Sequence, residues 1–78
     1  MKENDLDEDQ VEFLQKVARA ITACREVRCL TRNQVAKLVG IPHSSYARIE
    51  RGECNVRVAD LYAIARALES TTDNLIPY

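Results

Sequence analysis

The sequence has little of what folds rich in strands and tight turns need. Of its 78 residues none is Trp, one is Phe, two are Gly and two are Pro. So few glycines and prolines favour helices joined by short loops over many short strands. No apolar run approaches the roughly 20 residues that a bilayer-spanning helix needs. A chain of this length forms one domain with a small core.

Cysteine and histidine are too few and too irregularly spaced for a disulfide framework. Cys24, Cys29 and Cys54 are odd in number, no two form a C-x-x-C pair, and His43 is the single histidine. We therefore expect reduced thiols and no metal or other cofactor; a zinc site and a thiol switch at Cys54 are the less favoured alternatives. Two serines follow His43, but neighbouring positions of one helix point in different directions. From the sequence we therefore expect that the protein is not an enzyme.

Charge is nearly balanced overall, at −1, but it is unevenly distributed. Residues 1–12 hold one lysine against six carboxylates, whereas residues 13–57 hold nine basic and three acidic residues. The pattern predicts a disordered acidic tail over residues 1–6 and a basic folded body able to bind a polyanion. Shielding of the basic face by the tail is an alternative role. The N-terminus lacks the order of a signal peptide, so we expect a cytoplasmic protein with no membrane partner.

Apolar residues recur at helical spacing in five segments, and no segment alternates with a period of two. The predicted fold class is all-α, with helices near 7–28, 32–39, 42–51 and 57–69 and a last short turn over 71–76. Thr31 and Gln34 form a capping-box pattern before the second helix. Gly40 and Gly52 fit the ends of the second and third helices. We place a single domain over residues 7–78.

Two short helices joined by a few residues that include a glycine are the pattern of a helix-turn-helix, here over residues 31–52. Ala36 is small where the two helices must cross closely. Gly40 tolerates the positive φ of a sharp turn. Tyr46 and Ile49 supply apolar side chains that hold the helices together. All of these requirements are met within one window.

Within this window, residues 30–41 and 45–52 resemble the lambda-repressor/Cro-type helix-turn-helix of the xenobiotic-response-element (XRE) family, including the ending Ile49-Glu50-Arg51-Gly52. The resemblance extends over residues 30–76. It implies a compact five-helix domain whose third helix enters the major groove of double-stranded DNA, usually as a symmetric dimer. Phage-type repressors and restriction–modification controller proteins have this length and plan.

The resemblance also implies roles for individual positions. The residues that would face base edges are His43, Ser44, Ala47 and Arg48. Those that would contact phosphates are Thr31, Arg32, Ser45, Arg51, Asn55 and Arg57. Arg25 and Glu50 would form a structural ion pair between the first and third helices, and the homodimer would be formed through Leu75, Ile76 and Tyr78. Two departures are Arg32, where the family usually has glutamine, and Pro42, where it often has a hydroxyl residue.

Together these features predict a sequence-specific DNA-binding transcriptional regulator, a repressor or autoregulator that acts as a dimer on a palindromic operator. Two alternatives remain open at this point. One is an antitoxin that binds a toxin protein and its own operator. The other is a protein-interaction module that does not bind DNA.

Overall fold

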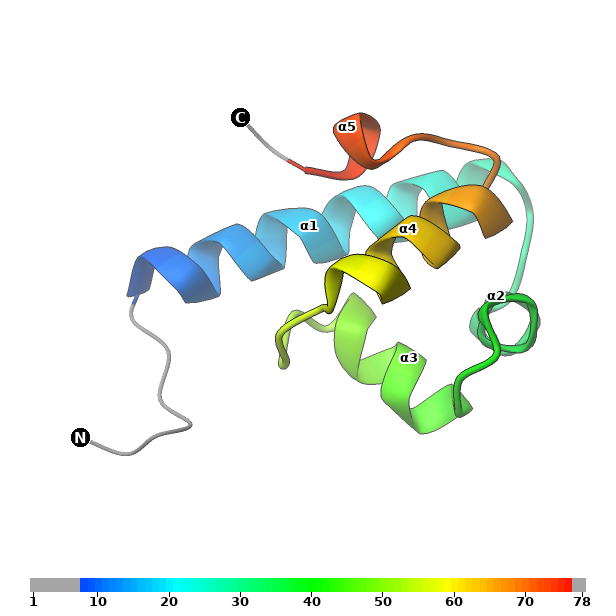
Figure 1. The fold of residues 1–78 in the computed structure, drawn as a ribbon, viewed down its shortest axis with the longest axis horizontal. Helices are drawn as coiled ribbons and strands as arrows, with labels where there is room; N and C mark the ends of the chain where they lie inside the picture. Colours follow the sequence, from blue (N-terminus) through cyan, green and yellow to red (C-terminus); the bar gives the residue numbers. More distant parts are fainter. Residues whose placement is uncertain (1–7, 77–78) are drawn as a thin grey trace.

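The computed structural model describes residues 8–76, and for residues 72 and 73 it describes the backbone alone. Along the chain the helices are α1 (Glu8–Val27), α2 (Arg32–Val39), α3 (His43–Glu50), α4 (Val58–Ala67) and α5 (Thr72–Leu75) (Figure 1). Residues 8–76 contain no strand, so the all-α prediction is confirmed. Four helices have eight residues or more, and α5 is a single turn. The predicted tail over 1–6 and Tyr78 lie outside the described residues.

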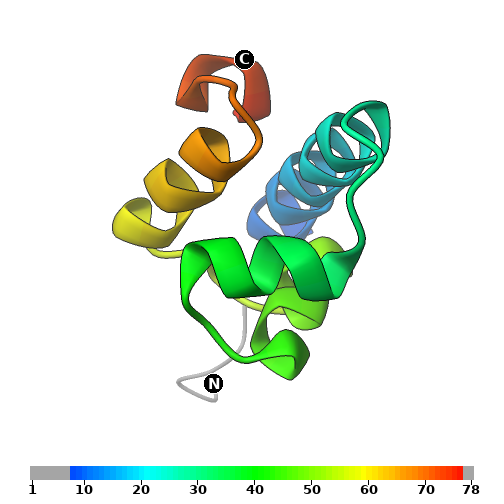
Figure 2. The ribbon, with the colours of Figure 1, turned by 90° about the vertical axis from the view of Figure 1, so that its right-hand side faces the viewer.

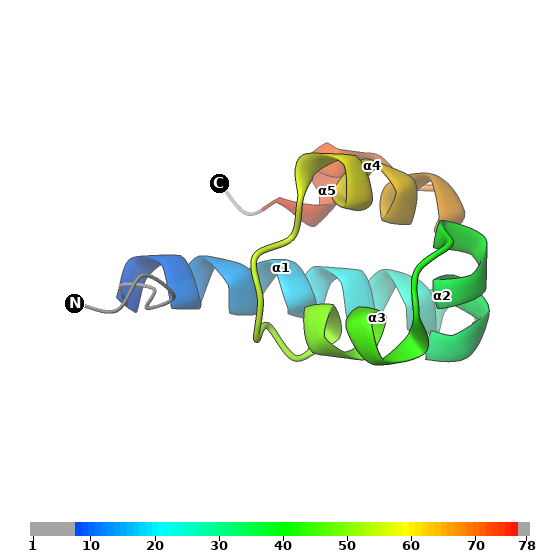
Figure 3. The same cartoon turned by 60° about the horizontal axis from the view of Figure 1, so that its bottom comes forward.

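The helices form a closed ring of neighbours around one core. α1 contacts α3 and α5, α2 contacts α3 and α4, and α4 contacts α5. Figure 2 shows α1 on one side and α4 with α5 on the other, while α3 lies at the lower edge of the molecule. Because α3 meets α1 and α2 through one face, its opposite face is at the outside of the domain (Figure 3).

Every helix contributes to the core. Ala36 is almost completely buried where α2 lies against α3 and α4, as its small size predicted. Tyr46, on α3, is the largest fully buried side chain. Leu75 of α5 is also fully buried and belongs to this core. The prediction that Leu75 lies in a dimer interface is therefore wrong, because its side chain has no surface left to offer a partner.

The helix starts show where local sequence decides the boundary. At α2 the predicted capping box is present: Thr31 N donates to Gln34 Oε1 over 2.7 Å, and Gln34 N donates to Thr31 Oγ1 over 3.1 Å. At α3, Pro42 occupies the position just before the helix, with an extended ψ of 146° and no side-chain cap. The predicted start of this helix therefore moves by one residue, to His43.

The four longer helices end in the same way. After each of them one residue has positive φ, and the next N–H donates to a carbonyl five residues back in a Schellman-type turn. Gly40 and Gly52 take this conformation without strain, at φ 86° and 70°. Cys29 and Glu69 take it with a Cβ, at φ 57° and 54°. Because Glu69 turns the chain, α4 ends at Ala67, two residues earlier than predicted.

Candidate nucleic-acid interface

α3 divides its side chains sharply between core and solvent. Tyr46 and Ile49 point inward and hold the helix against α1 and α2. His43, Ser44 and Arg48 are exposed, as their predicted contact with bases requires. Within the part of the chain that the structure describes, the side chain of Arg48 has no hydrogen-bond or ion-pair partner, so its guanidinium is available to a ligand.

The position of Ala47 differs from the prediction that it faces base edges. The residue is only 8% exposed, because it faces the inner side of α3 with Tyr46 and not the outer side with Arg48. A methyl group with so little surface has almost nothing to present to a base. We therefore remove Ala47 from the candidate interface.

A groove joins α3 to the segment that precedes α4. It has a volume of about 400 Å³, with Ile41, Ile49 and Cys54 among its lining residues. The polar residues at its edge are Ser45, Arg48, Asn55, Arg57 and Asp60. Four of these five were predicted as DNA contacts from positions up to 12 residues apart. The fold thus brings Arg48, predicted to contact a base, to the same groove as three of the residues predicted to contact phosphates.

All three arginines predicted to bind phosphates already have carboxylate partners. Arg51 Nε lies 3.0 Å from Glu53 Oε2, and Arg57 Nε lies 3.4 Å from Asp60 Oδ2. Arg32 Nε donates to Glu50 Oε1 over 3.1 Å. Close spacing in the sequence could have revealed the first two pairs. The third joins α2 to α3 and could not be read from spacing.

Glu50 is the centre of a partly buried polar cluster that joins α1, α2 and α3. Its side chain is 2% exposed, and Arg25 donates to it through Nε over 2.7 Å and Nη2 over 3.2 Å. The Arg25–Glu50 pair expected from the resemblance is therefore present. Two further donors were not predicted: Thr22 Oγ1, at 3.2 Å, and Arg32 Nε. Arg25 also donates to the Leu30 carbonyl over 2.8 Å, which ties the end of α1 to the start of the helix-turn-helix.

The cluster holds Glu50 ionised despite its burial. Burial alone would raise the carboxyl pKa, but the hydrogen bonds from Arg25 and the other donors outweigh it, and the pKa of Glu50 is lowered. The bond to Glu50 raises the pKa of Arg25 in turn. Burial, followed by the interaction of its hydroxyl with the nearby Glu50 carboxylate, raises the pKa of Tyr46. The two groups do not reach hydrogen-bond geometry, and the buried hydroxyl completes no hydrogen bond within the described residues.

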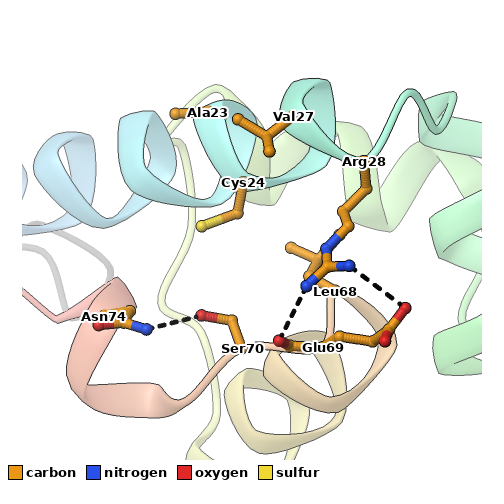
Figure 4. A pocket seen from close by; sticks show the side chains of 8 residues that line it. All are labelled: Ala23, Cys24, Val27, Arg28, Leu68, Glu69, Ser70 and Asn74. Carbon is orange, nitrogen blue, oxygen red and sulfur yellow. Dashed lines mark hydrogen bonds and ion pairs between the residues drawn. The ribbon is translucent and has the colours of Figure 1, made fainter.

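A second hollow, of about 310 Å³, lies away from α3, between the end of α1 and the turn from α4 to α5 (Figure 4). Arg28 closes one side of it by donating to the Glu69 carbonyl over 3.2 Å and pairing with the Glu69 carboxylate at 3.5 Å. Cys24 lines the hollow as a free thiol. Within residues 8–76, no group of His, Cys, Asp and Glu side chains is placed to hold a metal ion. No helix there is long and apolar enough to cross a membrane.

Two short helices at a fixed angle, the second with its outer face free, define the class of helix-turn-helix proteins. The chain belongs to the helix-turn-helix domain family, whose sequence profile matches residues 16–76. This places the chain among DNA-binding proteins of the type that residues 30–52 resembled. No curated protein gives a significant match.

Solved structures agree with this assignment. The restriction-modification controller protein C.AhdI from Aeromonas hydrophila superposes with a TM-score of 0.78 at 27% sequence identity, covering 81% of this chain and 96% of that one. An HTH_3 family transcriptional regulator from Vibrio cholerae superposes with a TM-score of 0.79 at 30% identity, covering 85% of this chain. The match covers 37% of that regulator, which is the longer protein.

Proposed function

We propose that this protein is a sequence-specific transcriptional regulator, a repressor or autoregulator, that inserts α3 into the major groove of DNA. The observation that carries the proposal is the outer face of α3, where His43, Ser44 and Arg48 are exposed while the inner face is fixed in the core. An arginine side chain that has no partner and lies on a rigid helix can donate two hydrogen bonds to a guanine, one to O6 and one to N7. Ser44 can donate or accept and therefore discriminates less.

The flanking residues would set the position of α3 along the groove. Ser45, Asn55 and Arg57 lie along the groove beside α3, and Arg51 follows the helix directly. Arg32 is the first residue of α2. The capping box occupies the N–H groups of Thr31 and Gln34, so an anion at this helix start would meet the N–H groups of Arg32 and Asn33. Contacts of this kind fix register on the duplex and carry little sequence information. A DNA duplex would replace or share the carboxylate partners of Arg51 and Arg57, which are both exposed pairs.

We further propose that the protein acts as a homodimer on a palindromic operator, with one α3 in each of two successive major grooves. With Leu75 buried, we place the contact with a second copy on the outer side of α4, which is one of several described places where large apolar side chains are exposed. Val58 and Tyr62 lie one turn apart there and are 83% and 55% exposed. Ile76, from the predicted interface, remains partly exposed. A domain this small gains a large share of its buried area from such a contact.

Selection of bound sequences from a random duplex pool tests binding, half-site symmetry and spacing together. We expect an enriched site with two inverted halves. On that site Arg48→Ala should cost about 1–3 kcal/mol of discrimination at one base pair of each half. Arg28→Ala is the matched control, since it removes the same charge from an exposed position that lines the other hollow. Absence of binding to any duplex at low salt would refute the proposal.

The oligomeric state can be measured separately by sedimentation. Tyr62→Glu should shift the protein toward the monomer, because it places a charge in the apolar contact. Leu38→Glu is the matched control, because Leu38 is a comparably exposed apolar residue on α2. A dimer that is equally stable with either substitution would place the interface elsewhere.

A further inference from the structure

We propose that Glu50 is a positioning residue for DNA binding, which holds Arg32 so that the rest of its guanidinium faces a phosphate at the start of α2. The inference rests on the proposed function, since it assigns a partner to one side of the same surface. It gives Glu50 a second role beside the structural pair with Arg25. A glutamine, the residue usual at the Arg32 position in the family, would bring no charge to this site.

The geometry leaves most of the Arg32 guanidinium free. Arg32 uses Nε to reach Glu50 Oε1 over 3.1 Å, and within the described residues its two Nη groups have no partner. The Arg32 side chain is 54% exposed, whereas Glu50 is 2% exposed. Glu50 thus anchors the guanidinium from behind, while four N–H groups remain at the surface. That fork matches two oxygens of a phosphate.

The charges of the cluster add up in favour of an anion. One carboxylate is shared by two arginines, so the cluster keeps a net positive charge. Arg25 is 11% exposed and donates both to Glu50 and to the Leu30 carbonyl, so it has little to offer a ligand. The excess charge is therefore presented to solvent by Arg32. An isolated Arg32–Glu50 pair would be neutral and would attract a phosphate weakly.

Anchoring also lowers the entropic cost of binding. A free arginine side chain loses rotamer freedom when it binds a phosphate, and that loss reduces affinity. Here the ion pair orders the side chain during folding, before DNA is present. Lysine cannot reproduce the arrangement, because its single ammonium has no planar fork to hold a carboxylate and a phosphate at fixed angles.

The test compares Arg32→Ala, Arg32→Lys and the control Arg28→Ala in binding to a labelled random-sequence duplex of about 30 base pairs, roughly three helical turns. A phosphate contact is independent of sequence, so no operator is needed. We expect Arg32→Ala to weaken binding roughly tenfold to a hundredfold and to lower the salt slope by about one. Arg32→Lys should reduce the affinity for the duplex nearly as much as Arg32→Ala, and Arg28→Ala should reduce it little.

The outcomes separate the inference from the proposed function. If the unaltered protein binds no duplex, the proposed function fails. If it binds, and Arg32→Lys binds equally well, Arg32 is a simple charge and the positioning role is overturned. If Arg32→Ala lowers only the unfolding midpoint and leaves the affinity of the folded protein unchanged, Arg32 merely completes the cluster, and the inference is again overturned.

The role of Glu50 itself is measured by a double-mutant cycle. In a Glu50→Gln background that circular dichroism shows to be folded, Arg32→Ala should cost clearly less affinity than in the unaltered protein. An equal cost in both backgrounds would show that Glu50 does not position Arg32. If Glu50→Gln does not fold, the comparison of Arg32→Lys with Arg32→Ala decides alone.

Discussion

Removal of Arg25 gives the most direct test of what holds α3 in place. Arg25→Met keeps much of the aliphatic stem and removes both hydrogen bonds to Glu50 and the one to the Leu30 carbonyl. Glu50, whose side chain is 2% exposed in the unaltered protein, then keeps two donors, Thr22 and Arg32. The substitution therefore leaves the Glu50 carboxylate without its main partner. It also removes the hydrogen bond that ties the end of α1 to the segment before α2.

The expected loss can be worked out from these contacts. Stranding a buried charge costs roughly 3–5 kcal/mol, and the remaining donors place this case at the lower end, near 3 kcal/mol. A domain of 78 residues has a total stability of roughly 4–12 kcal/mol. Arg25→Met should thus remove at least a quarter of the stability and lower the melting temperature by roughly 12 °C or more.

Chemical denaturation followed by circular dichroism measures the effect. The double variant Arg25→Met with Glu50→Gln is the decisive control, because removal of both charges leaves no buried carboxylate without its main partner. We expect it to be more stable than Arg25→Met alone by about 1–2 kcal/mol. A single variant within about 0.5 kcal/mol of the unaltered protein would refute the reasoning, because it would show that solvent reaches Glu50 freely.

The same cluster predicts a dependence on pH. The folded state lowers the pKa of Glu50 below the ordinary value of 4.5, so Glu50 adds stability above that value and loses it as pH falls through the lower, folded pKa. The difference in unfolding free energy between the unaltered protein and Glu50→Gln should shrink from about pH 6 to about pH 3. A constant difference over this range would contradict the ionised, paired state of Glu50.

Further predictions concern single positions, and denaturation measures each of them. Gly40→Ala should cost about 1–2 kcal/mol for its φ of 86° alone, since its Cβ would meet no atom within 4 Å. Gly52→Ala should cost at least about 1 kcal/mol more, because its Cβ would lie 3.1 Å from Gln15 Cα. Equal losses for the two variants would show that α1 can shift away from the added Cβ at little cost. Cys29→Gly should stabilise by about 1 kcal/mol, because it relieves φ 57° at the end of α1, and a loss would show that the thiol has a role. Tyr46→Phe should be neutral or slightly stabilising, and a loss above about 1 kcal/mol would reveal a hydrogen bond from the buried hydroxyl.

Local features of the sequence determined the helices and their order. The period of the apolar residues, the capping box of Thr31 with Gln34, and Gly40 and Gly52 depend on contacts within a few residues, so the printed sequence already contains them. The resemblance of residues 30–52 added the role of α3 and the Arg25–Glu50 pair. These predictions needed no knowledge of how the helices pack.

Tertiary structure alone decided which side chains face solvent at the margins of the core and which charges share a partner. Ala47 and Leu75 are buried because α1 and the other helices close over them, which no local pattern specifies. Arg32 reaches Glu50 only because α2 and α3 cross at a fixed angle. Burial and ion pairing between helices depend on separations of tens of residues, and those arise only once the ring of helices has closed.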